Sequence, residues 1–154
     1  MNAIVDFDVV AYTDGAYRID VDAGGWGVRL ITDEGVKELY GGEFRSDANR
    51  MELKAAVTAL ENVKYRSKVV IYSDSSYVVD GVLSWLPTWR REWELSDNVP
   101  RTNSDLWQAV RKMVNRHEIS WCWVKGHSIN QGNRRADILA TQGMEELIGE
   151  NYGM

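Results

Sequence analysis

Four carboxylic acids stand at positions in the sequence that make them candidates for one common site. They are Asp14, Glu52, Asp74 and Asp137. Carboxylate oxygens are the ligands that hard cations such as Mg²⁺ and Mn²⁺ prefer, whereas zinc prefers His and Cys. Two such ions about 3.5–4 Å apart can activate water on one side of a phosphodiester and stabilise the leaving oxygen on the other. Without metal, clustered acids repel one another, so a bound cation should also stabilise the fold.

Asp14 and Asp74 occupy the same place in two similar stretches, residues 9–17 (VVAYTDGAY) and 69–77 (VVIYSDSSY). β-Branched and aromatic runs closed by small turn residues predict strands of a sheet covered on both faces. Open α/β sheets bind ligands beyond the carboxyl ends of their strands, where the two acids would meet if the strands are parallel neighbours. In the alternative interpretation both acids only form turns, and Asp74 caps the following helix.

Glu52 belongs to a predicted helix that begins at an Asp47 N-cap and runs to residue 63. On a helical wheel at about 100° per residue, Glu52 falls in the middle of the apolar face. Burying an unpaired charge is costly, so an inward glutamate near two strand-end acids indicates a shared cation. The alternative is a capping box in which Glu52 pairs with Asn49.

The last predicted strand, residues 118–124, runs into a glycine-flanked loop that carries His127. A final helix is expected to begin near Asn133 and to carry Asp137 at the edge of its apolar stripe. Either residue alone would be read as an ordinary surface side chain. Their place next to the predicted sheet edge makes them candidates for the same site.

The other elements form a simple outline. Residues 26–31 and 36–40 flank a turn and predict a hairpin. Helices are expected over residues 75–85 and 104–114, with Pro87 breaking or restarting the first. The order is therefore β-β-β-α-β-α-α-β-α, and no internal linker divides it. We expect one domain over residues 1–154.

Trp85, Trp89 and Trp93 recur at four-residue spacing, interleaved with Arg90 and Arg91. Such a stripe is usually part of a core. It is also typical of a nucleic-acid-facing protrusion, in which aromatic rings and guanidinium planes lie along the bases or backbone.

Composition limits the function classes. The chain has 154 residues, of which 44% are hydrophobic, and it has no apolar stretch long enough to cross a membrane and no signal-peptide pattern. One cysteine, Cys122, excludes an internal disulfide framework and favours a reducing, cytoplasmic location. The net charge of −5 argues against indiscriminate polyanion binding. Residues 81–135 nevertheless hold nine Lys/Arg against five Asp/Glu, so the rest of the chain carries −9.

Together these motifs resemble type 1 ribonuclease H over nearly the whole chain. The matching stretches are residues 12–15 (YTDG), 49–53 (NRMEL), 73–75 (SDS), 123–127 (WVKGH) and 133–137 (NRRAD). Each piece alone is weak evidence, whereas this order and spacing is highly specific.

The resemblance implies a ribonuclease H-like α/β fold, with a mixed five-stranded sheet flanked by helices on both faces. It also implies cleavage of the RNA strand of RNA/DNA hybrids, leaving a 3′-hydroxyl and a 5′-phosphate. Asp14 would bridge two Mg²⁺ ions, which Mn²⁺ could replace, with Glu52 and Asp74 on one side. Asp137 would hold the ion that activates water, and His127 would assist proton transfer or product departure.

For the substrate, the resemblance implies that Asn49 contacts the hybrid in its minor groove and that Glu52 lies near the 2′-hydroxyl. The region from Trp85 to Arg101 matches a basic protrusion that grips the DNA strand. The expected substrate-binding residues are Asn49, Ser76, Trp85, Trp89, Arg90 and Arg91. A monomer without an obligate protein partner is the expected state.

Three departures from the family pattern concern substrate binding. The first loop, residues 17–22, carries an acid where an Asn contact is common; Ser76 stands where Gln is frequent; and residues 85–101 include three acids. Two other functions stay open at this point. One is a resolvase- or integrase-like nuclease, and the other is a hybrid-binding module without catalysis.

Overall fold

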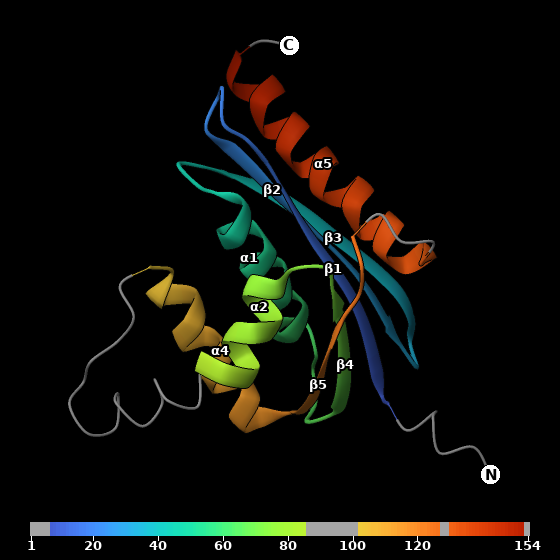
Figure 1. Ribbon diagram of the computed structural model, residues 1–154. Coiled ribbons are helices and arrows are strands. Elements are labelled where there is room, and N and C mark those ends of the chain that lie inside the picture. Colours follow the sequence, from blue (N-terminus) through green and yellow to red (C-terminus); the bar gives the residue numbers. More distant parts are fainter. Residues whose placement is uncertain (1–6, 86–101, 127–129, 153–154) are drawn as a thin grey trace.

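The computed structural model describes residues 7–85, 102–126 and 130–152, and in it five strands form one mixed sheet in the order β3-β2-β1-β4-β5 (Figure 1). The strands are β1 (Val9–Arg18), β2 (Ala23–Thr32), β3 (Gly35–Phe44), β4 (Lys68–Ser73) and β5 (Glu118–Trp123). The pairs β1–β2 and β2–β3 are antiparallel, whereas β1–β4 and β4–β5 are parallel. This confirms the mixed five-stranded sheet expected from the sequence.

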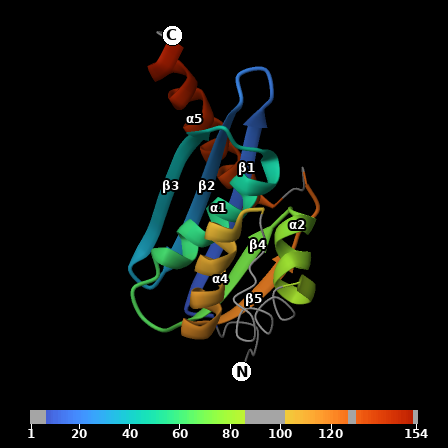
Figure 2. The ribbon, with the colours of Figure 1, turned by 90° about the vertical axis from the view of Figure 1, so that its left-hand side faces the viewer.

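Helices cover both faces of the sheet. They are α1 (Ala48–Glu61), α2 (Ser76–Asp80), the π-helical turn η2 (Gly81–Trp85), α4 (Ser104–Arg116) and α5 (Gln131–Tyr152). Figure 1 shows α5 on one side of the sheet and α1, α2 and α4 on the other, and Figure 2 looks onto the side with α1 and α4. No helix among the described ranges has the length and hydropathy needed to cross a bilayer.

The main core lies between α1 and the sheet. Small side chains of α1, including Ala55 and Ala59, pack against Val28, Leu30 and Ile71 of the strands, and all five are buried. A second cluster joins α1 to α4 around Trp107, whose side chain is fully buried. Burying one Val, Leu or Ile side chain contributes roughly 1.5–3 kcal/mol. The first cluster therefore holds α1 against the sheet, and the second holds it against α4.

Glycines in β2 let α5 lie directly on the sheet backbone. A Cβ atom built on Gly27 would lie 2.4 Å from the carbonyl oxygen of Ala136 and 2.5 Å from the nitrogen of Ala140. No side chain fits in that space, so only glycine permits this approach. The contact places the N-terminal half of α5, which carries Asp137, beside β1 and β2.

Two elements differ from the sequence-based expectation. β1 does not end at Gly15 but continues to Arg18, because it stays paired with β2 as far as Arg18 and Ala23. Its parallel pairing with β4 does end early, at Thr13 and Ser73. The helix expected over residues 75–85 is two pieces, α2 and η2, a distinction that apolar periodicity does not make.

Candidate metal centre

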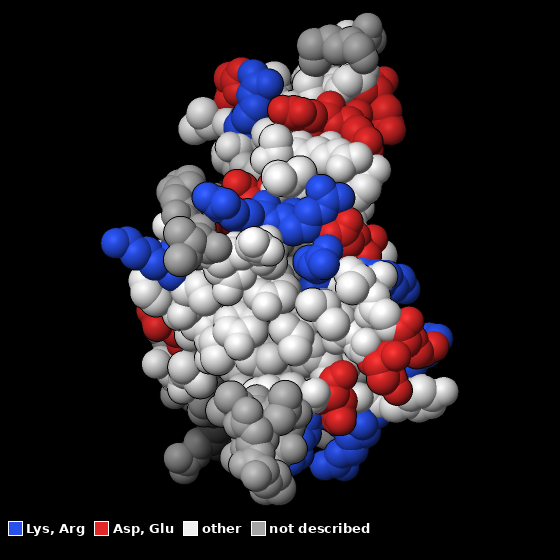
Figure 3. Space-filling model, turned by 90° about the vertical axis from the view of Figure 1, so that its right-hand side faces the viewer, with Lys and Arg blue, Asp and Glu red and all other residues white. Residues whose placement is uncertain are grey.

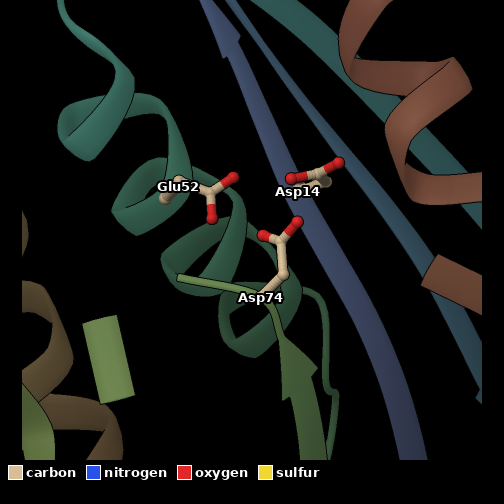
Figure 4. Close-up of side chains that lie close together, drawn as sticks. All are labelled: Asp14, Glu52 and Asp74. Atoms are coloured by element: carbon tan, nitrogen blue, oxygen red, sulfur yellow. The ribbon is translucent and has the colours of Figure 1, made fainter. Parts of the chain in front are cut away.

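Asp14, Glu52 and Asp74 come together at one edge of the β1–β4 ladder. Each offers one carboxylate oxygen, and these atoms all lie within 4.8 Å of one another. Figure 4 shows the three side chains reaching toward a common space from β1, from α1 and from the residue that follows β4. The three acids that sequence reasoning expected to meet are therefore adjacent.

Strand register explains why the two aspartates meet. Thr13 and Ser73 form the last pair of the parallel ladder, and each aspartate is the next residue along its chain. The Thr13 hydroxyl donates to the Tyr72 carbonyl at 3.3 Å, which ties the two strands together at this point. Asp14 is thus a mid-strand residue of β1, and the sequence-based placement at a strand end was wrong. It still lies where the β1–β4 pairing stops.

Gly15 brings Glu52 into the group. Its backbone N–H donates to Asp14 Oδ1 at 2.9 Å and also to Glu52 Oε1. A Cβ atom built on Gly15 would lie 2.6 Å from the Glu52 nitrogen and 2.7 Å from the Met51 carbonyl carbon. The backbone of α1 therefore passes directly over Gly15, and any larger residue there would push Glu52 away from Asp14.

The alternative interpretations, in which Glu52 belongs to a capping box and Asp74 caps a helix, are wrong. The N-cap of α1 is Asp47, whose carboxylate accepts from the Arg50 N–H at 2.7 Å, so Glu52 is not a capping-box partner. The N-cap of α2 is Ser75, whose hydroxyl accepts from the Val78 N–H at 3.2 Å. Neither acid caps the N-terminus of a helix. Glu52 is buried, as the helical wheel predicted.

The cluster is electrostatically strained. Burial, and next the negative charges of Asp74 and Asp137, raise the pKa of Asp14 to about 7, against the lowering effect of its hydrogen bonds. Burial and the neighbouring Asp14 and Asp74 raise the pKa of Glu52 well above its usual range. Within the described part of the chain, no Lys or Arg forms an ion pair with any of the three acids. A set of carboxylate oxygens that no described Lys or Arg pairs with fits a hard divalent cation.

The three acids line a cavity of about 430 Å³. Asp137 lines the same cavity from α5, although it is exposed and is not one of the three acids whose ligand atoms cluster. Asn133 also lines it, and its buried Oδ1 accepts no hydrogen bond from the described residues. The cavity therefore combines three close carboxylates, a fourth nearby and an amide oxygen whose hydrogen-bonding capacity is unused.

The expected substrate-binding residues are only partly described. Asn49 is exposed in the first turn of α1, and Ser76 is the exposed first residue of α2. Trp85 ends η2, but its side chain lies outside the described part of the structure. The residues wholly outside the described ranges are Trp89, Arg90, Arg91 and His127.

Sequence reasoning missed three residues at this site. Gly15 had been read only as a turn residue, although its N–H and its lack of a side chain place Glu52. Lys125 and Arg134 line the carboxylate cavity and had been read only as parts of motifs. Their positions, next to Gly126 and three residues before Asp137, were the available signal.

Comparisons with known proteins show which family the chain belongs to. The family model for RNase H matches residues 6–145. A ribonuclease H of Hahella chejuensis is 48% identical over 143 residues, which cover 92% of this chain and 97% of that protein. The ribonuclease H of Alcanivorax borkumensis is 47% identical over 141 residues, or 91% and 93% of the two chains.

Solved structures show the same architecture. The crystal structure of LC9-RNase H1, described as a type 1 RNase H with the type 2 active-site motif, is 28% identical with a TM-score of 0.73 and matches 90% of this chain and 72% of that one. The solution structure of the PFV RNase H domain has a TM-score of 0.77 at 23% identity, covers 94% and 99% of the two chains, and supports the fold alone. The family match, the curated relatives and the convergent carboxylates lead to one conclusion: this chain belongs to the RNase H family of nucleases.

Proposed function

We propose that this protein is an endonuclease that hydrolyses the RNA strand of RNA/DNA hybrids and leaves 3′-hydroxyl and 5′-phosphate ends. The observation that carries the proposal is the convergence of Asp14, Glu52 and Asp74 within 4.8 Å in a chain of this family. Acids that are buried together at neutral pH are costly, so their retention is best explained by a cation that they share.

The four acids Asp14, Glu52, Asp74 and Asp137 would hold two Mg²⁺ ions, with Mn²⁺ as a possible substitute. When bound, such a pair supplies an activated water and stabilises the leaving oxygen of the phosphodiester. Asp14 would be the shared ligand, because it lies beside Glu52 and Asp74 and lines the same cavity as Asp137. The Gly15 N–H fixes the Glu52 carboxylate toward Asp14.

The remaining roles are assigned to residues around the cavity. Asn49, which follows the cavity-lining Ala48, and Ser76, two residues after Asp74, are both exposed and would contact the hybrid. Glu52 would also lie near the ribose 2′-hydroxyl that distinguishes RNA from DNA. His127 would move a proton or assist product departure. The DNA strand would be gripped by the segment that contains Trp85, Trp89, Arg90 and Arg91. The protein would act in the cytoplasm as a monomer without an obligate protein partner.

The test is cleavage of one sequence presented as RNA/DNA hybrid, duplex RNA, duplex DNA and single-stranded RNA, with Mg²⁺ or with chelator. Asp14→Asn is the inactive variant, and Asp80→Asn, an exposed aspartate on α2, is its matched control. We expect that the wild type and Asp80→Asn cut only the RNA strand of the hybrid, and only with metal. Binding of the hybrid without cleavage in Mg²⁺ or Mn²⁺ would favour a binding module. Cleavage of the duplex DNA, or of a branched DNA tested beside it, would favour a resolvase-like enzyme.

A further inference from the structure

Two positively charged side chains line the carboxylate cavity, and neither is paired to an acid in the described part of the chain. Lys125 follows the end of β5 and Arg134 lies in the first turn of α5, so they reach the cavity from separate elements. Both are exposed. Among the described residues, no carboxylate lies within ion-pair distance of either cation.

Other arginines of the molecule, in contrast, form ion pairs with acids of the protein. Arg29 and Arg135 both bind Glu38, and Arg50 binds Glu43 and Asp105. In these cases the protein uses the guanidinium internally, which leaves it little capacity to bind a ligand. Lys125 and Arg134 form no ion pair with the described residues, although four acids line the same cavity.

The neighbours of the two cations favour a phosphate partner. Lys125 precedes Gly126, where a Cβ atom would lie 3.4 Å from Asp74 Oδ2, and Arg134 stands three residues before Asp137. Metal ions bound at the carboxylates would neutralise much of the acidic charge, so the free cations would then attract an anion. A substrate with a phosphate at every nucleotide offers such anions on both sides of the bond that is cut.

We propose that Lys125 and Arg134 are substrate-binding residues that hold the backbone phosphates flanking the scissile phosphodiester of the RNA strand. This inference rests on the proposed function. Lys125 supplies a mobile point charge, whereas the planar guanidinium of Arg134 can donate two parallel hydrogen bonds to one phosphate. The chain has a net charge of −5, so cations placed at the site itself contribute a large share of the attraction for a polyanion.

The experiment measures hybrid affinity and cleavage kinetics for Lys125→Gln, Arg134→Gln and the double variant. Lys112→Gln on α4 and Arg66→Gln in the α1–β4 connection are the matched controls, because both are exposed cations that do not line the carboxylate cavity. Affinity is measured over a series of KCl concentrations, in chelator and also with Mg²⁺ on an Asp14→Asn background, so that binding is read without cleavage both without metal and with metal at the remaining acids. We expect each site variant to weaken binding roughly three- to tenfold, mainly as a rise in KM, and to lower the salt slope by about one.

A different outcome would show that the two cations only offset the charge of the carboxylates. In that case hybrid affinity and salt slope would equal those of the control variants, while Mn²⁺ binding measured by calorimetry would become tighter because a repelling charge is gone. Arg134→Lys adds a further check, since it keeps the charge and loses the paired donors: partial recovery of affinity supports phosphate binding. If the wild type binds hybrid in this salt-dependent way but does not cut it, the proposed hydrolysis fails while the phosphate-binding pair stands.

Discussion

Ionisation of the Asp14 carboxyl lowers the stability of the folded protein when no metal is bound. The unfolded chain releases this proton near the ordinary value of 3.8, whereas the folded protein holds it until about pH 7. The folded state therefore binds more protons in between, and the stability of the metal-free protein falls as the pH rises from about 4 to 7. Above about pH 7 Asp14 itself is charged, and its repulsion with the neighbouring acids is then present.

Asp14→Asn should accordingly be more stable than the wild type in chelator at pH 8. An asparagine oxygen can still accept from the Gly15 N–H, but one of the repelling charges is gone. We expect a gain of about 1–3 kcal/mol in the free energy of unfolding, which urea titration measures. Added Mg²⁺ should stabilise the wild type and much less the variant. A variant that is less stable than Asp80→Asn in chelator would contradict a strained carboxylate cluster.

His117 is a second residue with a pH-dependent effect, far along the chain from the metal centre. Its Nδ1 accepts the Ser67 N–H at 3.1 Å, and its buried Nε2 has no partner among the described residues. Burial, and then the charges of Arg116 and Arg66, lower the pKa of His117 below 6.5. At low pH the unfolded chain takes up this proton first, so the stability held above pH 6.5 is lost as the pH falls through the folded-state pKa.

His117→Asn should remove this pH dependence, because an asparagine oxygen accepts the Ser67 N–H and does not titrate. The measurement is the free energy of unfolding of both proteins at pH 7.5 and pH 5.5. We expect the wild type to lose stability relative to the variant at the lower pH. The carboxylates contribute equally to both proteins and cancel in the difference. An unchanged difference would mean that His117 has the same pKa in the folded and the unfolded state, which would contradict the effect of its burial.

Gly15 determines how closely helix α1 packs on strand β1. Gly15→Ala would place a methyl group against the backbone of Met51 and Glu52, so the helix must shift outward. We expect a loss of about 1–3 kcal/mol in stability from overpacking. Because the shift also separates Glu52 from Asp14, the stabilisation by Mn²⁺ should fall as well. Calorimetric titration with Mn²⁺ checks this: a destabilised variant with unchanged metal affinity would show that Gly15 does not position the carboxylates.

Particular elements show how far sequence reasoning reaches. The burial of Glu52 followed from helical periodicity, and the approach of Asp74 to Asp14 followed from two similar runs, because both signals are local. The continuation of β1 past Gly15 did not follow, since it depends on pairing with β2, which only the folded sheet supplies. The close packing of α5 on Gly27 and the position of Arg134 at the cavity also depend on contacts between segments that are distant in the sequence. The sequence alone therefore did not predict them.

At the scale of the whole molecule, charge is distributed unevenly. The chain carries −5 overall, yet on the face that Figure 3 shows, Lys and Arg side chains form a band across the middle, with acidic side chains gathered above it. Many of the described arginines are already bound to acids of the protein itself. Arg18, Arg29, Arg50 and Arg135 are therefore less available to replace the counterions of a nucleic acid.

The affinity for RNA/DNA hybrid should depend on salt less steeply than that of a family member with a positive net charge. Each phosphate that a protein neutralises contributes roughly 0.7–0.9 to the slope of log K against log salt concentration, so fewer contacts mean a shallower line. The measurement is hybrid binding in chelator from low to high KCl for both proteins, with the same duplex. Each protein is used as an inactive variant, Asp14→Asn here and the matching substitution in the relative. Residual metal then cannot lead to cleavage of the hybrid during the binding measurement. A slope equal to or steeper than that of the basic relative would mean that this acidic protein engages as many phosphates, and that its net charge does not limit binding.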